Sequence, residues 1–278
     1  MPRLRYVFAD VFTDTALEGN QLAVFTDGRD VDDATMQAIA LEIGFSETVF
    51  VLPPESGGTV RIRIFTPFSE LPFAGHPVLG SAFVLGAPLQ LDVITLETGR
   101  GNIPVRLERD ESGRIVFGRM EQPVPSVEPV ADTAPVYAAL RREGSELPVE
   151  RYENGPTFIL VAIPSEEDLA AMNPDTAAVA ALGNTGVLCF AGSGTTWTAR
   201  MFWSGGEDPA TGSAAGPLAC HLARHGRIAW GEQITISQGA AVRRPSTLYA
   251  VAEGGNGLID RVEVGGRAVT IARGELKL

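Results

Sequence analysis

The 278-residue chain is poor in several residue types that mark specialised proteins. It has 2 cysteines and 3 histidines, and its 22 basic residues are outnumbered by 34 acidic ones, for a formal net charge of −12. Cys189 and Cys220 form no C-x-x-C pattern or disulfide framework, and their apolar neighbours predict buried, reduced thiols. Because so negative a surface repels phosphate backbones and anionic lipid, we expect no nucleic-acid or membrane partner.

The N-terminal stretch MPRLRYVFADVFTDTALEGN lacks a long apolar run, since Asp10 and Asp14 interrupt it. We therefore expect neither a signal peptide nor a membrane span, and we expect a cytoplasmic protein. The rest of the composition, 45% hydrophobic and 20% charged residues, is that of a globular protein. The length suffices for one large domain or two ordinary ones.

What the chain does contain is an internal repeat. RIRIFTPFSELPFAGHP, from Arg61, matches TARMFWSGGEDPATGSA, from Thr198, at a constant offset of 137 residues. Both carry R-x-F-x4-E-x-P-x-x-G between a predicted strand and a predicted apolar helix, and five identities in register favour duplication over chance. With the proline-rich segment 122–135 as linker, the pattern predicts two similar α/β modules, 1–123 and 124–278, related by an approximate two-fold axis. The last strand is a candidate to pack on the first module.

In each copy the glycine, Gly75 or Gly212, lies at the start of the predicted helix. The free N–H groups and partial positive charge of a helix N-terminus bind carboxylate or phosphate. A glycine there lets a ligand approach the backbone closely. If the modules face each other, the two helix starts converge on a cleft that holds an anionic substrate without a metal.

The two copies differ at positions that bear reactive side chains. Position 76 is histidine where its partner 213 is serine, and position 208 is aspartate where its partner 71 is leucine. We predict that His76, Asp208 and Ser213 belong to the site; helix capping is the alternative for His76 and Ser213. Glu47, in GFSETVFV, opens an apolar strand, where partial desolvation suits a carboxyl group to proton transfer. A solvated residue at a strand start is an equal alternative for Glu47.

The motifs LEGNQLAVF, GFSETVFV, FTPFSELPFAGHPVLG, NGPTFILV, GEDPATGSAAGPLACHLARHG and RRPS together resemble the PhzF family of phenazine biosynthesis, in order along the whole chain. The resemblance implies the diaminopimelate-epimerase type of fold: two pseudo-symmetric α/β domains, each a barrel-like β-sheet around a central helix. It also implies a homodimer with the active site between the domains and no cofactor or metal. The implied reaction is isomerisation of trans-2,3-dihydro-3-hydroxyanthranilate, a small anionic cyclic amino acid, by transfer of a proton from C3 to C1.

By the same resemblance, Glu47 carries the proton, while His76 and Asp208 orient the substrate and polarise its conjugated system. Ser213 and the amides near Gly212 hold the substrate carboxylate. The remaining implied contacts are Asn20, Ser46, Gly75 and Thr211. Epimerases of this fold use one cysteine at each helix start, but His76 and Ser213 stand there instead. Two-thiol chemistry is therefore excluded, and a one-base shuttle by Glu47 remains.

Three departures from the family pattern affect the substrate more than the reaction type. Gln21 replaces the usual proline after GN, the short WSGG segment places Trp203 near the expected site, and Arg243 precedes RPS where glycine is typical. Two alternatives therefore stay open. One is a PhzF-like isomerase or epimerase of another small amino or carboxylic acid, and the other is a ligand-binding protein without catalysis.

Other motifs are weaker. His221 and His225 lie four apart on a predicted helix, but the sequence shows no third ligand and no glutamate of an H-E-x-x-H site. AGSGTTW lacks the third glycine of a dinucleotide fingerprint and the lysine of a P-loop. ATGSAAG is not the G-x-S-x-G elbow of a serine nucleophile. We therefore predict no metal or nucleotide site and no covalent serine catalysis.

Overall fold

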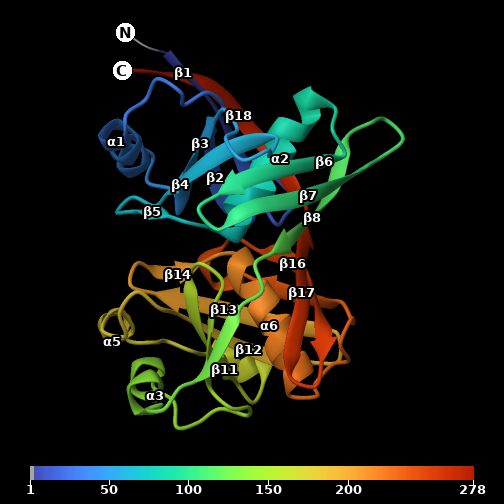
Figure 1. Cartoon of the computed structure of the whole chain (residues 1–278). Coiled ribbons are helices and arrows are strands. Elements are labelled where there is room, and N and C mark those ends of the chain that lie inside the picture. The colour runs from blue at the N-terminus through green and yellow to red at the C-terminus, as the bar shows by residue number, and fades with distance from the viewer. Residues whose placement is uncertain (1–2) are drawn as a thin grey trace. The chain divides into compact units, whose positions relative to one another are not determined.

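Figure 1 shows the computed structural model, which describes residues 3–278. The chain divides into two compact units: the first runs up to Glu121 and includes Gly265–Leu278, and the second is Gln122–Val264. The division after Glu121 lies beside the boundary drawn from the sequence at 123. Gly265–Leu278 belongs to the first unit, on which the sequence made the last strand a candidate to pack.

Within residues 3–121 and 265–278, the first unit has two helices and a series of paired strands. Its strands pair in the order β18–β1–β2–β3–β4–β6–β7–β8; β2/β3 and β4/β6 are parallel, the other neighbours are antiparallel, and β5 adds to β4. The elements are β1 (Arg3–Val11), β2 (Asn20–Phe25), α1 (Asp33–Ile43), β3 (Glu47–Leu52), β4 (Val60–Phe65), β5 (Glu70–Leu71), α2 (Gly75–Leu89), β6 (Val93–Thr98), β7 (Gly101–Arg109), β8 (Ile115–Gln122) and β18 (Ala268–Lys277).

The second unit repeats this pairing scheme. From β10 to β16 the order β10–β11–β12–β13–β15–β16 alternates antiparallel and parallel as β1–β2–β3–β4–β6–β7 does, with β14 added to β13 and β9 to β10. The elements are β9 (Ser126–Pro129), α3 (Ala134–Leu140), β10 (Glu150–Glu153), β11 (Thr157–Ala162), α4 (Glu166–Ala170), α5 (Thr176–Ala180), β12 (Gly186–Ser193), β13 (Thr196–Trp203), β14 (Gly206–Asp208), α6 (Gly212–Arg224), β15 (Ile234–Gln238), the 3₁₀ turn η1 (Ala240–Val242), β16 (Ser246–Gly255) and β17 (Leu258–Gly266).

Each unit encloses one apolar helix. In α2 every residue from Gly75 to Gly86 is buried, and the helix contacts strands β1, β2, β3, β6, β7 and β18. In α6 every residue from Gly212 to Ala223 is buried. A helix that is apolar on all sides is stable only when it is surrounded by protein. The two pseudo-symmetric α/β units, each with a sheet around a central helix, confirm the predicted fold class.

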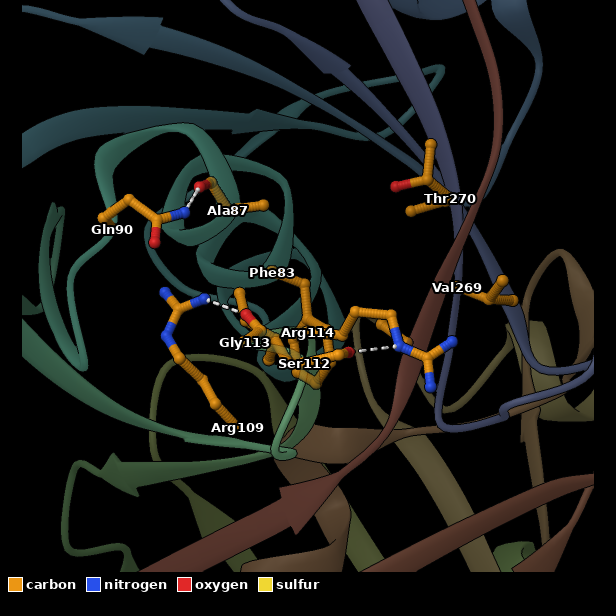
Figure 2. Close-up of a pocket in the computed structure, with 12 residues that line it drawn as sticks. Phe83, Ala87, Gln90, Arg109, Ser112, Gly113, Arg114, Val269 and Thr270 are labelled. Carbon is orange, nitrogen blue, oxygen red and sulfur yellow. Dashed lines mark hydrogen bonds between the residues drawn. The ribbon is translucent and has the colours of Figure 1, made fainter.

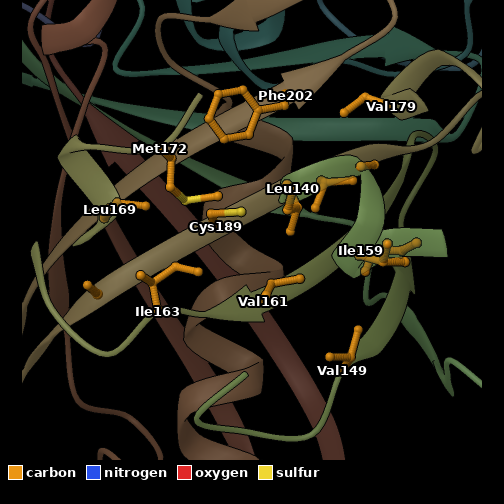
Figure 3. Close-up of a cluster of buried hydrophobic side chains, with 14 residues drawn as sticks. Leu140, Val149, Ile159, Val161, Ile163, Leu169, Met172, Val179, Cys189 and Phe202 are labelled. Atoms are coloured by element: carbon orange, nitrogen blue, oxygen red, sulfur yellow. The ribbon is translucent and has the colours of Figure 1, made fainter. Parts of the chain in front are cut away.

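A second layer of helices covers the outer face of the sheet in the second unit. Figure 3 shows side chains from α3, α4, β11 and β12 packed into one cluster that includes Leu140, Leu169, Val161 and Cys189. Cys189 here and Cys220 in α6 are both buried and free, as predicted. Among residues 3–278, none of the helices is long and apolar enough to cross a membrane.

The repeated R-x-F-x4-E motif builds the same clamp in both units. Arg63 on β4 donates from Nε and Nη2 to the two carboxylate oxygens of Glu70 on β5, at 2.8 and 2.7 Å. Arg200 on β13 donates in the same way to Glu207 on β14, at 2.9 and 2.7 Å. Each guanidinium also lies over the phenylalanine ring two residues later, 5.1 and 5.0 Å from its centroid. The clamp fixes the hairpin that leads into the central helix, which explains why the motif occurs twice.

Candidate active site

Two predicted site residues of the first unit lie where β3 and α2 begin. Glu47 is the first residue of β3, and His76 is the second residue of α2. Oε2 of Glu47 and Nε2 of His76 are 3.3 Å apart, and the two side chains are only 15% and 5% exposed. The alternative of a solvated residue at position 47 is therefore wrong. The structure brings the predicted acid/base and the predicted histidine into direct contact.

Two further predicted residues orient His76. The Ser46 hydroxyl donates to Oδ1 of Asn20 at 2.7 Å, and Nδ2 of Asn20 lies 3.2 Å from Nδ1 of His76. The two ring nitrogens of His76 face different groups: Nδ1 lies near Asn20 and Nε2 near Glu47, and the ring also makes a hydrogen bond to the Gln21 backbone. Ser46, Asn20, His76 and Glu47 thus lie in one continuous row of polar contacts.

Burial controls the charge of His76. Desolvation lowers the pKa of the imidazole to about 3, far below its ordinary value of 6.5. The ring is therefore neutral at physiological pH. An imidazole with so low a pKa is a weak base, so Glu47 remains the group suited to proton transfer.

The predicted site residues of the second unit lie at the start of α6 and just before it. Asp208 ends β14, and the Thr211 hydroxyl donates to its Oδ2 at 2.5 Å. Gly212 and Ser213 are the first two residues of α6, whose first turn contains no acidic residue. The same holds for α2, which starts at Gly75. The charge at both helix starts is thus left for a ligand anion.

The capping alternative for His76 and Ser213 is wrong. The N-cap residue of α2 is Ala74 and that of α6 is Thr211, so both candidates lie inside their helices rather than at the cap. Both are also largely buried, at 4% and 5% exposure. Neither side chain is a solvated cap.

Sequence reasoning missed three residues that hold the start of α6. Nε2 of Gln122 donates to the Gly212 carbonyl at 2.8 Å, and Nδ2 of Asn154 donates to the Ser213 carbonyl at 2.9 Å. The third is Gln238, which contacts Thr211. The Ser213 carbonyl needs an outside donor because Pro217, four residues on, has no N–H.

Of these three, only Asn154 had a sequence signal. It opens the NGP motif, and it contacts position 213 in the second unit as Asn20 contacts the repeat-equivalent position 76 in the first. Gln122 and Gln238 end strands, and no local pattern marks them.

The structure shows the local surroundings of the three residues that depart from the family pattern, Arg243, Trp203 and Gln21. Arg243 has a φ of 60°, in the left-handed region that favours glycine, which fits the glycine expected there from the resemblance. Trp203 ends β13, and its ring lies against Gly205, where a Cβ would come within 2.4 Å of the indole. Gln21 lies on β2 and pairs with Asp10.

His221 and His225 do have a third partner, contrary to the expectation from sequence. Oε2 of Glu150, on β10, lies 3.1 Å from Nδ1 of His221 and from Nε2 of His225. Burial alone would raise the pKa of Glu150, but hydrogen bonds from His221, His225 and Tyr152 outweigh it and lower the pKa to about 2. Arg224 donates to the same oxygen at 2.9 Å. Its guanidinium supplies the positive charge that a metal ion would otherwise bring to this carboxylate.

A pocket in the first unit lies apart from these residues. Figure 2 shows it between the C-terminal part of α2, the β7–β8 turn and strand β18. Its two cationic side chains are engaged: Arg109 donates to the backbone carbonyls of Gly86, Leu91 and Gly113, and Arg114 pairs with Asp110. None of the predicted site residues lines this pocket.

Duplicated α/β units, each with polar side chains at the start of an enclosed helix, are the arrangement expected of an isomerase of the predicted family. Residues 9–274 match the family model described as phenazine biosynthesis-like protein (PhzC-PhzF), and the chain belongs to this family. It is 47% identical to the trans-2,3-dihydro-3-hydroxyanthranilate isomerase of Pseudomonas aeruginosa over 99% of both chains.

Solved structures agree with this assignment. A PhzF-family protein from Bacillus anthracis superposes with a TM-score of 0.86 at 22% identity, covering all of both chains. A predicted epimerase from Pseudomonas aeruginosa superposes with a TM-score of 0.84 at 33% identity, covering 98% of this chain and 99% of the other. The predicted family, fold class and isomerase class are confirmed.

Proposed function

We propose that the protein is a cofactor-independent isomerase that converts trans-2,3-dihydro-3-hydroxyanthranilate in phenazine biosynthesis, with Glu47 carrying a proton from C3 to C1. The observation that carries the proposal is the shielded contact between Glu47 and neutral His76. The similarity to isomerases of this name extends over nearly the full length of both chains, which supports the same substrate.

The reaction needs one base that becomes one acid. The Glu47 carboxylate takes the proton from C3, and the electron pair left behind shifts through the conjugated ring toward C1. The protonated Glu47 then returns the proton to C1, so protons and electrons balance without an oxidant or a second base. Partial shielding suits the carboxylate to proton transfer, while its 15% exposure lets protonated Glu47 exchange with solvent before it returns the proton to C1.

The other predicted residues bind and polarise the substrate in this proposal. His76, whose Nε2 lies 3.3 Å from Oε2 of Glu47, orients the substrate together with Asp208. Asp208 binds the amino and hydroxyl groups, while Ser213 and the free amides around Gly212 receive the substrate carboxylate. A helix start without an acidic residue in its first turn favours such an anion.

Isotope transfer in deuterated water tests the proposal. Wild-type protein incubated with the cyclohexadiene substrate converts it, with deuterium entering at C1. In Glu47→Gln we expect turnover to fall by about 10²–10⁴-fold, the usual contribution of a general acid–base group. Glu42→Gln, at an exposed position of α1, is the matched control and retains wild-type turnover.

Two results would redirect the assignment. In the first, the protein does not turn over this substrate and yet catalyses Glu47-dependent hydrogen exchange in another small amino or carboxylic acid. That result would identify a PhzF-like isomerase of other specificity. Tight binding without exchange in the wild type would identify a ligand-binding protein on this scaffold.

We also propose a homodimer, as the family resemblance implies, working in the cytoplasm. Size-exclusion chromatography with light scattering measures the first property. Fractionation of the producing cell measures the second.

A further inference from the structure

Gln238 ends β15 and spans the segment that joins Asp208 to α6. Its side chain is 4% exposed. Oε1 accepts from the backbone N–H of Thr211 at 3.2 Å, while Nε2 donates to the Asp208 carbonyl at 2.9 Å and to Oγ1 of Thr211 at 3.0 Å. One buried amide thus contacts both ends of residues 208–211.

These contacts determine the direction of the Thr211 hydroxyl. A hydroxyl has one hydrogen and two lone pairs. Because Nε2 of Gln238 donates to Oγ1, that contact occupies a lone pair and leaves the hydrogen for Oδ2 of Asp208, 2.5 Å away. The hydroxyl therefore donates to the carboxylate, in the short charge-assisted geometry.

The backbone next to Gln238 supports the same segment. Gly239 has a φ of 85°, and a Cβ there would lie 2.5 Å from the Pro209 carbonyl oxygen and 2.2 Å from that of Arg244. The end of β15 thus packs directly on the backbone between Asp208 and Thr211. Gln238 therefore contacts a segment, residues 208–211, whose backbone is already held in place by close packing.

We propose that Gln238 is a positioning residue that fixes the Asp208 carboxylate through the Thr211 hydroxyl. The inference rests on the proposed role of Asp208 in binding the substrate. Gln238 itself does not touch the substrate; it sets which oxygen of Asp208 is held by Thr211 and where the other one points.

A double-mutant cycle of Gln238→Met and Thr211→Val tests the inference. Misplacing a substrate-orienting group costs up to about 100-fold, so we expect each single variant to lose about 10- to 100-fold in kcat/KM on trans-2,3-dihydro-3-hydroxyanthranilate. Both changes break the same series of contacts, from Gln238 through the Thr211 hydroxyl to Asp208. The kcat/KM of the double variant should therefore equal that of Thr211→Val alone, within about two-fold. Thr211→Ser keeps the hydroxyl and restores most of the activity.

A second variant and a control separate positioning from folding. Gln238→Glu keeps the size of the side chain and an acceptor for the Thr211 N–H but loses both donors and buries a negative charge, so a lower Tm is expected along with the loss of activity. Its kcat/KM is therefore compared with wild type at a temperature where circular dichroism shows both proteins folded. Ser246→Ala alters the residue paired with Gln238 on β16, whose hydroxyl donates to the Arg244 carbonyl, and keeps wild-type kcat/KM.

The inference and the proposed function fail in different ways. An inactive wild type would remove the proposed function. An active wild type with additive losses in the cycle, or with full activity in folded Gln238→Met or Gln238→Glu, would refute the role of Gln238 alone.

Discussion

The two arginine–glutamate clamps provide a matched stability experiment inside one chain. They share geometry but not burial: the Arg200 and Glu207 side chains are 12% and 10% exposed, whereas those of Arg63 and Glu70 are 21% and 41% exposed. Arg63 has a second carboxylate partner in Asp33. Arg200 instead donates from Nη1 to three backbone carbonyls, those of Leu169, Ala170 and Met172.

Replacing Glu207 or Glu70 by glutamine should therefore lower the free energy of unfolding by different amounts. Glu207→Gln leaves a buried guanidinium with no carboxylate in its clamp, and breaking a buried pair costs about 3–5 kcal/mol. We expect the lower end, about 3 kcal/mol, because glutamine keeps one acceptor oxygen. Glu70→Gln leaves Arg63 with Asp33 near solvent, where an ion pair contributes about 1 kcal/mol or less.

Urea unfolding measures the difference. All three tryptophans, at 197, 203 and 230, lie in the second unit, so their fluorescence reports Glu207→Gln, while far-UV circular dichroism reports both variants. A gap of about 2 kcal/mol corresponds to about 1 M urea at an ordinary m-value. A midpoint lowered as much by Glu70→Gln as by Glu207→Gln would refute the reasoning from burial.

Two further predictions concern the first unit. Burial holds the pKa of His76 near 3 in the folded protein, against about 6.5 in the unfolded chain, so the unfolded state binds more protons below pH 6.5. Lowering the pH from 7 to 5 should therefore reduce the free energy of unfolding by about 2 kcal/mol through this residue. Urea titrations at both pH values should show the loss in wild type and not in His76→Asn. Gly80→Ala places a Cβ 2.6 Å from Leu22 and 2.7 Å from Val11, and this overpacking should lower the free energy of unfolding by about 1–3 kcal/mol. In the control, Gly144→Ala, the added Cβ meets no atom within 4 Å, so the calorimetric Tm should stay unchanged.

Local sequence signals predicted those features that short segments determine. Five repeated identities indicated the duplicated hairpin and helix, whereas the apolar strand after Glu47 left a shielded and a solvated carboxyl group equally open. An aspartate at the start of an apolar helical pattern, Asp32 or Asp33, predicts an N-cap, and in the structure Asp32 caps α1 by accepting from the Thr35 N–H.

Features that depend on distant partners were not predictable in this way. Glu150 meets His221 and His225 across 71 and 75 residues, and Gln238 reaches Thr211 across 27. None of these pairs shares a periodic pattern. Strand β18 is only partly buried along its length, so its sequence gave no alternation to show which unit it joins.

The pairing of β1 with β18, from Arg3↔Lys277 to Val11↔Ala268, has a consequence for the nascent polypeptide. Residues 122–264 are contiguous, so the second unit takes all of its strands from one continuous segment. The first unit needs residues 268–277 as well as its N-terminal segment, since without them β1 has β2 alone as a neighbour and an open hydrogen-bonding edge. Loss of β18 would thus damage the unit that was translated first.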